Sequence, residues 1–192
     1  MQRTLQWLSI YNCRELFWSE NPFLIETLQQ LTQLQHLDLS KDDPEENMGL
    51  PAFLDCSQIL VDKDFLERLL PSLPNLTWLD LSGNAKFSFG DLKLFQQCYP
   101  QMLKFLGLFM TDMCSFPEIP ADQVSGNGNV KQITLSVKIY NNRPTFLTSA
   151  MRELFNIIRD EYPDLDKNLM CNVVLGAMES QTKDKHIQLA GR

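Results

Sequence analysis

Leu76-Thr-Trp-Leu79-Asp-Leu81-Ser-Gly-Asn84 is the stretch of the sequence that decides the fold. Leu79 and Leu81 stand two residues apart, so on a short strand their side chains point into the same core. Asn84 stands where the chain must turn. Its amide can hydrogen-bond backbone groups that strand pairing leaves without a partner. The stretch therefore predicts a short strand followed by a turn that an asparagine side chain stabilises.

The same spacing recurs along the chain, and the recurrence defines the fold class. The other matches are Leu5-Leu8-Ile10-Cys13, Leu34-Leu37-Leu39-Asp42, Leu103-Leu106-Leu108-Thr111 and Val130-Ile133-Leu135-Lys138. The first positions of the five matches are 29, 42, 27 and 27 residues apart. Leucine-rich repeats are about 20–29 residues long, so the longest step needs an insertion, for which Lys41–Gln58 is the expected place.

We therefore expect an α/β leucine-rich-repeat solenoid of about five irregular repeats, with parallel strands on its concave face. One row of the sheet should contain the second apolar residue of each match: Leu8, Leu37, Leu79, Leu106 and Ile133. The expected strands are Leu5–Tyr11, Gln35–Ser40, the stretch around Leu79–Leu81, Lys104–Phe109 and Lys131–Ser136. The expected helices between them follow Asn21-Pro22 and cover Asp64–Leu70 and Asp91–Gln97. Ser115–Asn129 reads as a loop, because it is rich in proline and glycine.

The pattern changes after Pro144, where strands give way to helices. Phe146–Tyr162 has apolar residues at helical spacing, and further helices are expected at Leu169–Met178 and from His186 onward. Helices that follow one another without strands are typical of an α-solenoid. We thus expect a leucine-rich-repeat domain at residues 1–143 and the first helices of an armadillo-like solenoid at residues 144–192. Neither end has a polar capping repeat, which favours an internal fragment of a longer protein.

Composition excludes several classes of function. The chain has 192 residues and a formal net charge of −7, which argues against a nucleic-acid or anionic-membrane surface. No apolar run approaches the roughly 20 residues that span a bilayer. The five cysteines form an odd number and contain no Cys-x-x-Cys pair. This pattern predicts reduced thiols in the cytosol or the nucleus.

Candidate catalytic residues are scarce. The two histidines, His36 and His186, lie far apart in the sequence, and no serine or cysteine stands in a nucleophile motif. Metal-ligand spacings are absent. The glycine-rich Ser125–Asn129 lacks the Gly-Lys-Ser/Thr ending of a phosphate-binding loop, so it reads as a turn. We expect a protein that is not an enzyme and has no cofactor or metal.

A protein-binding surface has more support. On each expected strand, the residue before the second core position points onto the concave face. These residues form one column: Trp7, His36, Trp78, Phe105 and Gln132. Tyr11 and Phe109 add rings further along the strands, and Asp38 and Asp80 lie between. Aromatic side chains beside carboxylates suit a protein interface. Two interpretations stay open, a separate protein partner or another part of the same polypeptide that covers this face.

The chain also resembles the Zyg-eleven and Zer-one family. The resemblance rests on the order of the modules and on four segments: Leu34-Gln-His-Leu-Asp-Leu-Ser40, Leu76–Asn84, Phe105-Leu-Gly-Leu108, and Val173–Met178 with His186–Gly191. It implies a substrate receptor of a cullin-2 RING ubiquitin ligase. In that family an amino-terminal box binds elongins B and C and cullin-2, and carboxy-terminal armadillo-like repeats bind amino-terminal degrons. Neither part is expected in this chain, apart from the first helices.

The resemblance implies that the repeat arc spaces the ligase-docking end from the degron-binding repeats within the ubiquitin-conjugation pathway. The alternative from the residues alone is a free-standing leucine-rich-repeat binder or enzyme inhibitor that uses the aromatic concave column.

Overall fold

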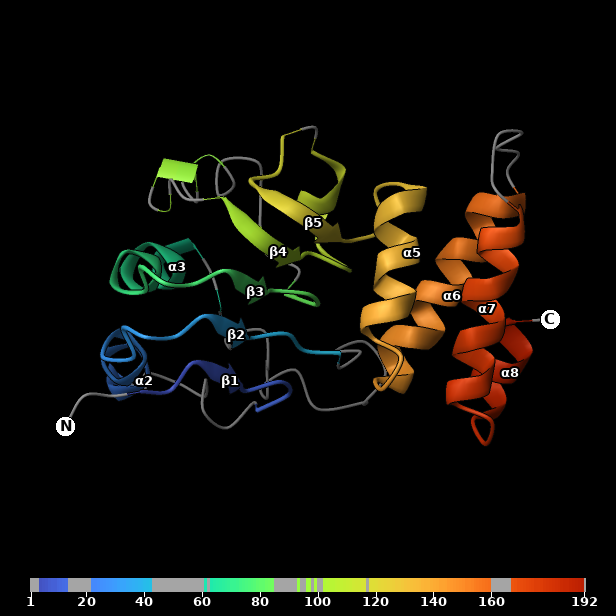
Figure 1. Cartoon of the computed structure of the whole chain (residues 1–192), viewed down its shortest axis with the longest axis horizontal. Helices are drawn as coiled ribbons and strands as arrows, with labels where there is room; N and C mark the ends of the chain where they lie inside the picture. The colour runs from blue at the N-terminus through green and yellow to red at the C-terminus, as the bar shows by residue number, and fades with distance from the viewer. Residues whose placement is uncertain are drawn as a thin grey trace, which may run out of the picture.

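The structure is a computed structural model, and it describes residues 4–13, 22–42, 61, 63–84, 93, 96–97, 99, 102–116, 118–159 and 167–191. Its centre is a five-stranded parallel sheet in which every strand neighbours the strand before it in sequence. The strands are β1 (Trp7–Ser9), β2 (His36–Asp38), β3 (Trp78–Asp80), β4 (Leu103–Gly107) and β5 (Ala121–Ser125). Figure 1 shows them stacked in this order, with their carboxyl ends toward the helices α5 to α8.

The register of the sheet confirms most of the predicted row. Leu8 pairs with Leu37, Leu37 with Leu79, and Leu79 with Leu106. The last three of these leucines have no exposed surface. The first four strands therefore form where the leucine spacing predicts them.

The prediction for the fifth strand was wrong. The fifth member of the row is Val124, which pairs with Leu106, and not Ile133. Strand β5 lies inside the stretch predicted as a loop, whereas the predicted strand Lys131–Ser136 belongs to helix α5 (Val130–Ile139). The physical reason is a helix start at Asn129, whose side chain accepts a hydrogen bond from the backbone N–H of Gln132. Ile133 and Val137 are then buried on one face of this helix.

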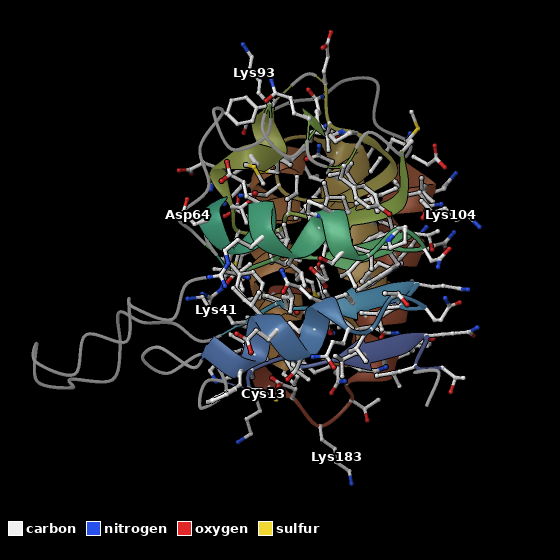
Figure 2. The ribbon with its side chains drawn as sticks, turned by 90° about the vertical axis from the view of Figure 1, so that its left-hand side faces the viewer. Cys13, Lys41, Asp64, Lys93, Lys104 and Lys183 are labelled. Carbon is white, nitrogen blue, oxygen red and sulfur yellow. The ribbon has the colours of Figure 1, made fainter. Side chains whose placement is uncertain are left out.

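Helices α2 (Pro22–Gln29) and α3 (Lys63–Leu69) pack side by side against the leucine face of the sheet. Figure 2 shows both in front of the strands. The short helix η2 (Leu70–Ser72) continues α3 and contains Pro71. A second short helix, η3 (Asp112–Ser115), follows β4. The predicted insertion and the predicted helix Asp91–Gln97 lie mostly outside the described residues.

The turn asparagine works as predicted. The buried side chain of Asn84 donates hydrogen bonds to the backbone oxygens of Leu39, at 3.1 Å, and Leu81, at 2.9 Å. One amide thus joins two neighbouring turns of the chain. In the next turn the Thr111 hydroxyl donates to the backbone oxygen of Leu108, three residues before it, at 2.8 Å.

The carboxy-terminal part is helical, and the sequence predicts this from Pro144 onward. It contains α5, which was predicted as a strand, and then α6 (Pro144–Arg159), α7 (Lys167–Ser180) and α8 (Lys185–Ala190). A first apolar cluster lies between the sheet and helices α2 and α3. A second cluster joins the four carboxy-terminal helices and includes Phe109, from just after β4. Within the described residues, no helix is long and apolar enough to cross a bilayer.

Candidate protein-binding surface

The face of the sheet opposite the leucine cluster carries a column of stacked rings, which we call the ring column: Trp7, His36, Trp78 and Phe105. Sheet register places these residues side by side on β1 to β4. Ring centroids lie 4.1 Å apart between Trp7 and His36, 3.6 Å between His36 and Trp78, and 4.5 Å between Trp78 and Phe105. The predicted column is therefore a continuous stack.

The ring column is open at its amino-terminal end and closed at the other. Trp7 is 66% exposed, whereas Phe105 is only 3% exposed, and His36 and Trp78 are half-buried. Burial lowers the pKa of His36 to about 4, although the nearby Asp38 opposes this shift. Since the imidazole is then neutral at physiological pH, the column presents an uncharged aromatic surface.

The fifth position of the column differs from the prediction. Gln123 on β5 pairs with Phe105, so it takes the place predicted for Gln132. Gln132 is instead a buried residue of α5, and its amide donates to the backbone oxygen of Cys114 at 2.9 Å. The error follows from the misplaced fifth strand.

One step along the strands, a second column consists of short or acidic residues, in the register Ser9, Asp38, Asp80, Gly107 and Ser125. Asp38 and Asp80 are 1% and 0% exposed. Each carboxylate accepts a hydrogen bond from the backbone N–H two residues later, that of Ser40 or Ser82, at 3.0 Å. The repeated Leu-Asp-Leu-Ser therefore places each aspartate as a local cap of the turn after its strand.

Tyr140 and Arg143, between α5 and α6, cover these two carboxylates. The guanidinium of Arg143 donates to Asp38 and lies 3.5 Å from Asp80, and it also donates to Ser40 at 2.7 Å. The Tyr140 hydroxyl lies 3.1 and 3.2 Å from the Asp80 oxygens. We call Asp38, Asp80, Tyr140 and Arg143 the polar seam. It joins the sheet to the helical part.

Burial controls the electrostatics of the polar seam. It raises the pKa of Asp80 to about 6, with a further rise from Asp38, while Ser82 and Arg143 act in the opposite direction. It also raises the pKa of Tyr140 well above its usual value. Burial lowers the pKa of Arg143, but the two carboxylates outweigh that effect and raise it overall. The arginine thus stays charged and compensates two buried acids.

Tyr11 and Phe109, the remaining predicted residues, also contact the helical part. The Tyr11 ring lies under the Arg143 guanidinium, with 4.1 Å between its centroid and the guanidinium carbon. Phe109 is fully buried, and its ring centroid lies 5.6 Å from that of Phe146 in an edge-on arrangement. For Tyr11, Phe109, Asp38 and Asp80, the structure therefore matches the second interpretation, cover by the same polypeptide. Trp7, His36 and Trp78 retain exposed surface.

Tyr140 and Arg143 were not among the predicted site residues. The two aspartates carried the available signal, because carboxylates at equivalent positions on the concave face need a cation when that face is covered. In the described part of the chain, no group of three or more histidine, cysteine or acidic residues could hold a metal ion.

Replacing Tyr140 with phenylalanine is expected to lower the free energy of unfolding by about 1–3 kcal/mol. The hydroxyl lies 2.6 Å from that of Ser82 and 2.8 Å from that of Ser125, besides its contacts to Asp80. Its removal takes from the buried Ser125 hydroxyl its Tyr140 partner, and it takes one of several partners from Ser82 and from Asp80. Urea denaturation would measure the loss, and Tyr11→Phe, at a part-buried site, is the control. Equal losses in both variants would contradict the assigned role of Tyr140.

Comparison with known proteins finds relatives by sequence. A zer-1 homolog of Drosophila melanogaster is 30% identical over 153 residues, covering 66% of this chain and 19% of the relative. The human zer-1 homolog is 26% identical over 193 residues, covering 87% of this chain and 23% of the relative. Zyg eleven-related protein 1 of Caenorhabditis elegans is 25% identical over 198 residues, covering 100% of this chain and 22% of the relative.

The chain thus spans about a fifth of the length of these relatives. No protein-family model matches the sequence, and no solved structure matches the chain.

Proposed function

The chain belongs to the Zyg-eleven and Zer-one family, and we propose that it is a non-catalytic part of a substrate receptor in a cullin-2 RING ubiquitin ligase. In this proposal the sheet is a leucine-rich-repeat arc and helices α5 to α8 begin an armadillo-like solenoid. The complete protein binds elongins B and C and cullin-2 before the arc, and amino-terminal degrons after it. The complex works in the cytosol or the nucleus.

The observation that supports a spacer role is the polar seam. It ties β2 and β3 to the turn between α5 and α6 through two carboxylates, one guanidinium and one phenol. The aromatic contact between Phe109 and Phe146 lies beside it. A hinge at this place would leave buried charges without partners, which is costly. The junction therefore holds the angle between arc and helices, as a spacer between ligase and substrate requires.

A pull-down with elongins B and C and cullin-2 tests the proposal. The full-length protein that contains this chain is expected to retain all three, whereas the 192-residue chain alone is expected to retain none. In the full-length protein, Arg143→Ala should leave elongin binding intact and slow ubiquitylation of a reporter with an amino-terminal glycine. Arg152→Ala, an exposed change on α6, is the control. Failure of the full-length protein to bind elongins would refute the proposal.

The ring column supports a second candidate, a free-standing binder. Trp7 is 66% exposed at the end of an uncharged aromatic stack, and tryptophan is enriched among residues that dominate binding energy. If the column binds a protein, Trp7→Ala is expected to weaken that complex at least about thirtyfold, which corresponds to about 2 kcal/mol.

Affinity capture from cell extract with quantitative mass spectrometry would measure this effect. Phe23→Ala is the matched control, because Phe23 is 70% exposed on α2, away from the ring column. A captured protein that Trp7→Ala and Phe23→Ala retain in equal amounts does not bind through the ring column. If every captured partner behaves in that way, the second candidate fails.

A further inference from the structure

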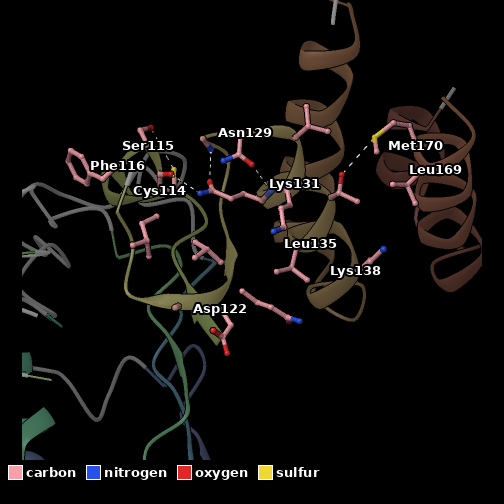
Figure 3. Close-up of a pocket in the computed structure, with 18 residues that line it drawn as sticks. Cys114, Ser115, Phe116, Asp122, Asn129, Lys131, Leu135, Lys138, Leu169 and Met170 are labelled. Atoms are coloured by element: carbon pink, nitrogen blue, oxygen red, sulfur yellow. Dashed lines mark hydrogen bonds between the residues drawn. The ribbon is translucent and has the colours of Figure 1, made fainter. Parts of the chain in front are cut away.

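A groove lies between the last strand of the sheet and the helical part. It has a volume of about 920 Å³ and is lined by β5, by the segment between η3 and β5, by α5 and by the start of α7. Figure 3 shows Asp122 of β5 on one side of this space, Lys131, Leu135 and Lys138 of α5 on the other, and Met170 of α7 beyond α5. No described residue fills this space, so it can accept a ligand.

The floor of the groove offers apolar contacts and a strand edge. Val124, Leu135 and Met170 are among its lining residues. β5 is the last strand in the sheet order, so among the described residues its outer edge has no strand beside it. The backbone oxygen of Ser125 faces β4, because it accepts a hydrogen bond from the N–H of Leu108 at 2.8 Å. Backbone groups of successive strand residues point to opposite sides, so the N–H and C=O of Val124 point to the outer edge. An extended segment could therefore pair with this edge.

At the carboxyl end of β5, the next backbone groups are already hydrogen-bonded and cannot pair with a ligand. Both the N–H and the C=O of Gly126 are hydrogen-bonded to the hydroxyl of Ser136 on α5, at 2.9 and 3.0 Å. The pairing edge is therefore short. Side chains must supply most of the binding energy.

Two lysines give the groove its charge. Lys131 and Lys138 line it from α5 and are exposed. Among the described residues neither forms an ion pair. Among the lining residues that the structure describes, Asp122 is the one carboxylate, so lysines outnumber acids in this described lining.

The spacing of the lysines sets the length of the ligand. Residues seven apart on a helix are separated by about 10.5 Å along the axis. About three residues of extended chain span the same distance. A peptide with two acidic residues three positions apart, and apolar residues between them, matches both lysines and the apolar floor.

We propose that this groove binds an extended acidic peptide segment of a partner protein, with its carboxylates at Lys131 and Lys138 and its apolar side chains against Val124, Leu135 and Met170. The site is separate from the ring column and from the polar seam. It does not depend on the proposed ligase function.

Fluorescence anisotropy with a labelled peptide tests this proposal on the full 192-residue chain. The probe is Ser-Glu-Val-Val-Glu-Ser with blocked ends, and the control peptide has lysine at both glutamate positions. The acidic peptide is expected to bind saturably and more weakly as salt rises. The lysine peptide is expected not to bind.

Paired variants locate the site. Lys131→Glu with Lys138→Glu is expected to weaken binding of the acidic peptide at least about tenfold. Lys183→Glu with Lys185→Glu makes the same change of charge at α7–α8 and is expected to alter binding less than about twofold. Thermal unfolding would verify that both double variants are folded.

Three results would overturn the proposal: no binding of the acidic peptide at low salt, equal binding of the two peptides, or equal effects of the two double variants. Self-association in analytical ultracentrifugation that Lys131→Glu with Lys138→Glu abolishes would also overturn it. In that case the occupant of the groove is a second copy of this chain.

Discussion

Replacing Arg143 with alanine is expected to lower the free energy of unfolding by about 3–5 kcal/mol. The guanidinium compensates Asp38 and Asp80, whose side chains are 2% and 0% exposed. Without it, two carboxylates that are almost inaccessible in the native structure lose their cation. Chemical denaturation would measure the loss. At about 2–4 °C per kcal/mol for a chain of this size, thermal unfolding should shift by about 10 °C.

Companion variants separate lost charge from lost packing. Arg143→Lys keeps the positive charge but loses the guanidinium that donates to two groups at once, so we expect an intermediate loss of unfolding free energy. Asp80→Asn in the Arg143→Ala background removes one of the stranded charges and should recover part of the stability. Arg152→Ala, exposed on α6, should change stability by less than about 0.5 kcal/mol. If Arg143→Ala proves no more harmful than this control, the polar seam does not hold the two parts together.

Replacing Gly107 with alanine is the second change with a large expected effect, a loss of about 3 kcal/mol or more. A methyl group at this position would lie 2.0 Å from Oδ1 of Asp80 and 3.1 Å from its Cα atom. The carboxylate would have to leave its hydrogen bonds to Tyr140 and to the N–H of Ser82. Crowding of a packed site costs about 1–3 kcal/mol, and buried groups left without partners cost about 1–3 kcal/mol more.

The matched control is Gly176→Ala on α7. An added methyl group there meets nothing within 4 Å, and alanine favours a helix over glycine by about 0.5–1 kcal/mol. Urea denaturation should therefore show the two alanine substitutions changing stability in opposite directions. A small effect of Gly107→Ala would mean that Asp80 has room to move and that the polar seam is loosely packed.

The first four strands could be predicted because their leucines are large, regularly spaced and followed by a turn residue. β5 could not be found in this way. Ala121-Asp-Gln-Val-Ser has one large apolar residue, Val124, so its strand pattern is weak. Val130, Ile133 and Leu135 fit the repeat spacing by coincidence. The helical spacing of Val130, Ile133 and Val137, with a capping residue before them, describes the same segment better.

In the candidate site, only the contacts between neighbouring strands could be predicted from the sequence. Stacking of Trp7, His36 and Trp78 follows from strand register, which the repeat spacing determines. Cover of the aspartates depends on residues far away in sequence, since Tyr140 is 60 residues from Asp80 and Arg143 is 105 residues from Asp38. Spacing within one repeat carries no information about such contacts.

The sequential order of the strands has a consequence for synthesis on the ribosome. Each new strand finds its neighbour already made, so the sheet can grow from the amino terminus as the chain emerges. The carboxylate of Asp38 does not find its partner in this way, because Arg143, which compensates its charge, is translated 105 residues later. Until then this carboxylate must remain hydrated, so the face of the nascent sheet that carries Asp38 stays exposed to solvent. Emergence of Arg143 is the event that allows this face to close.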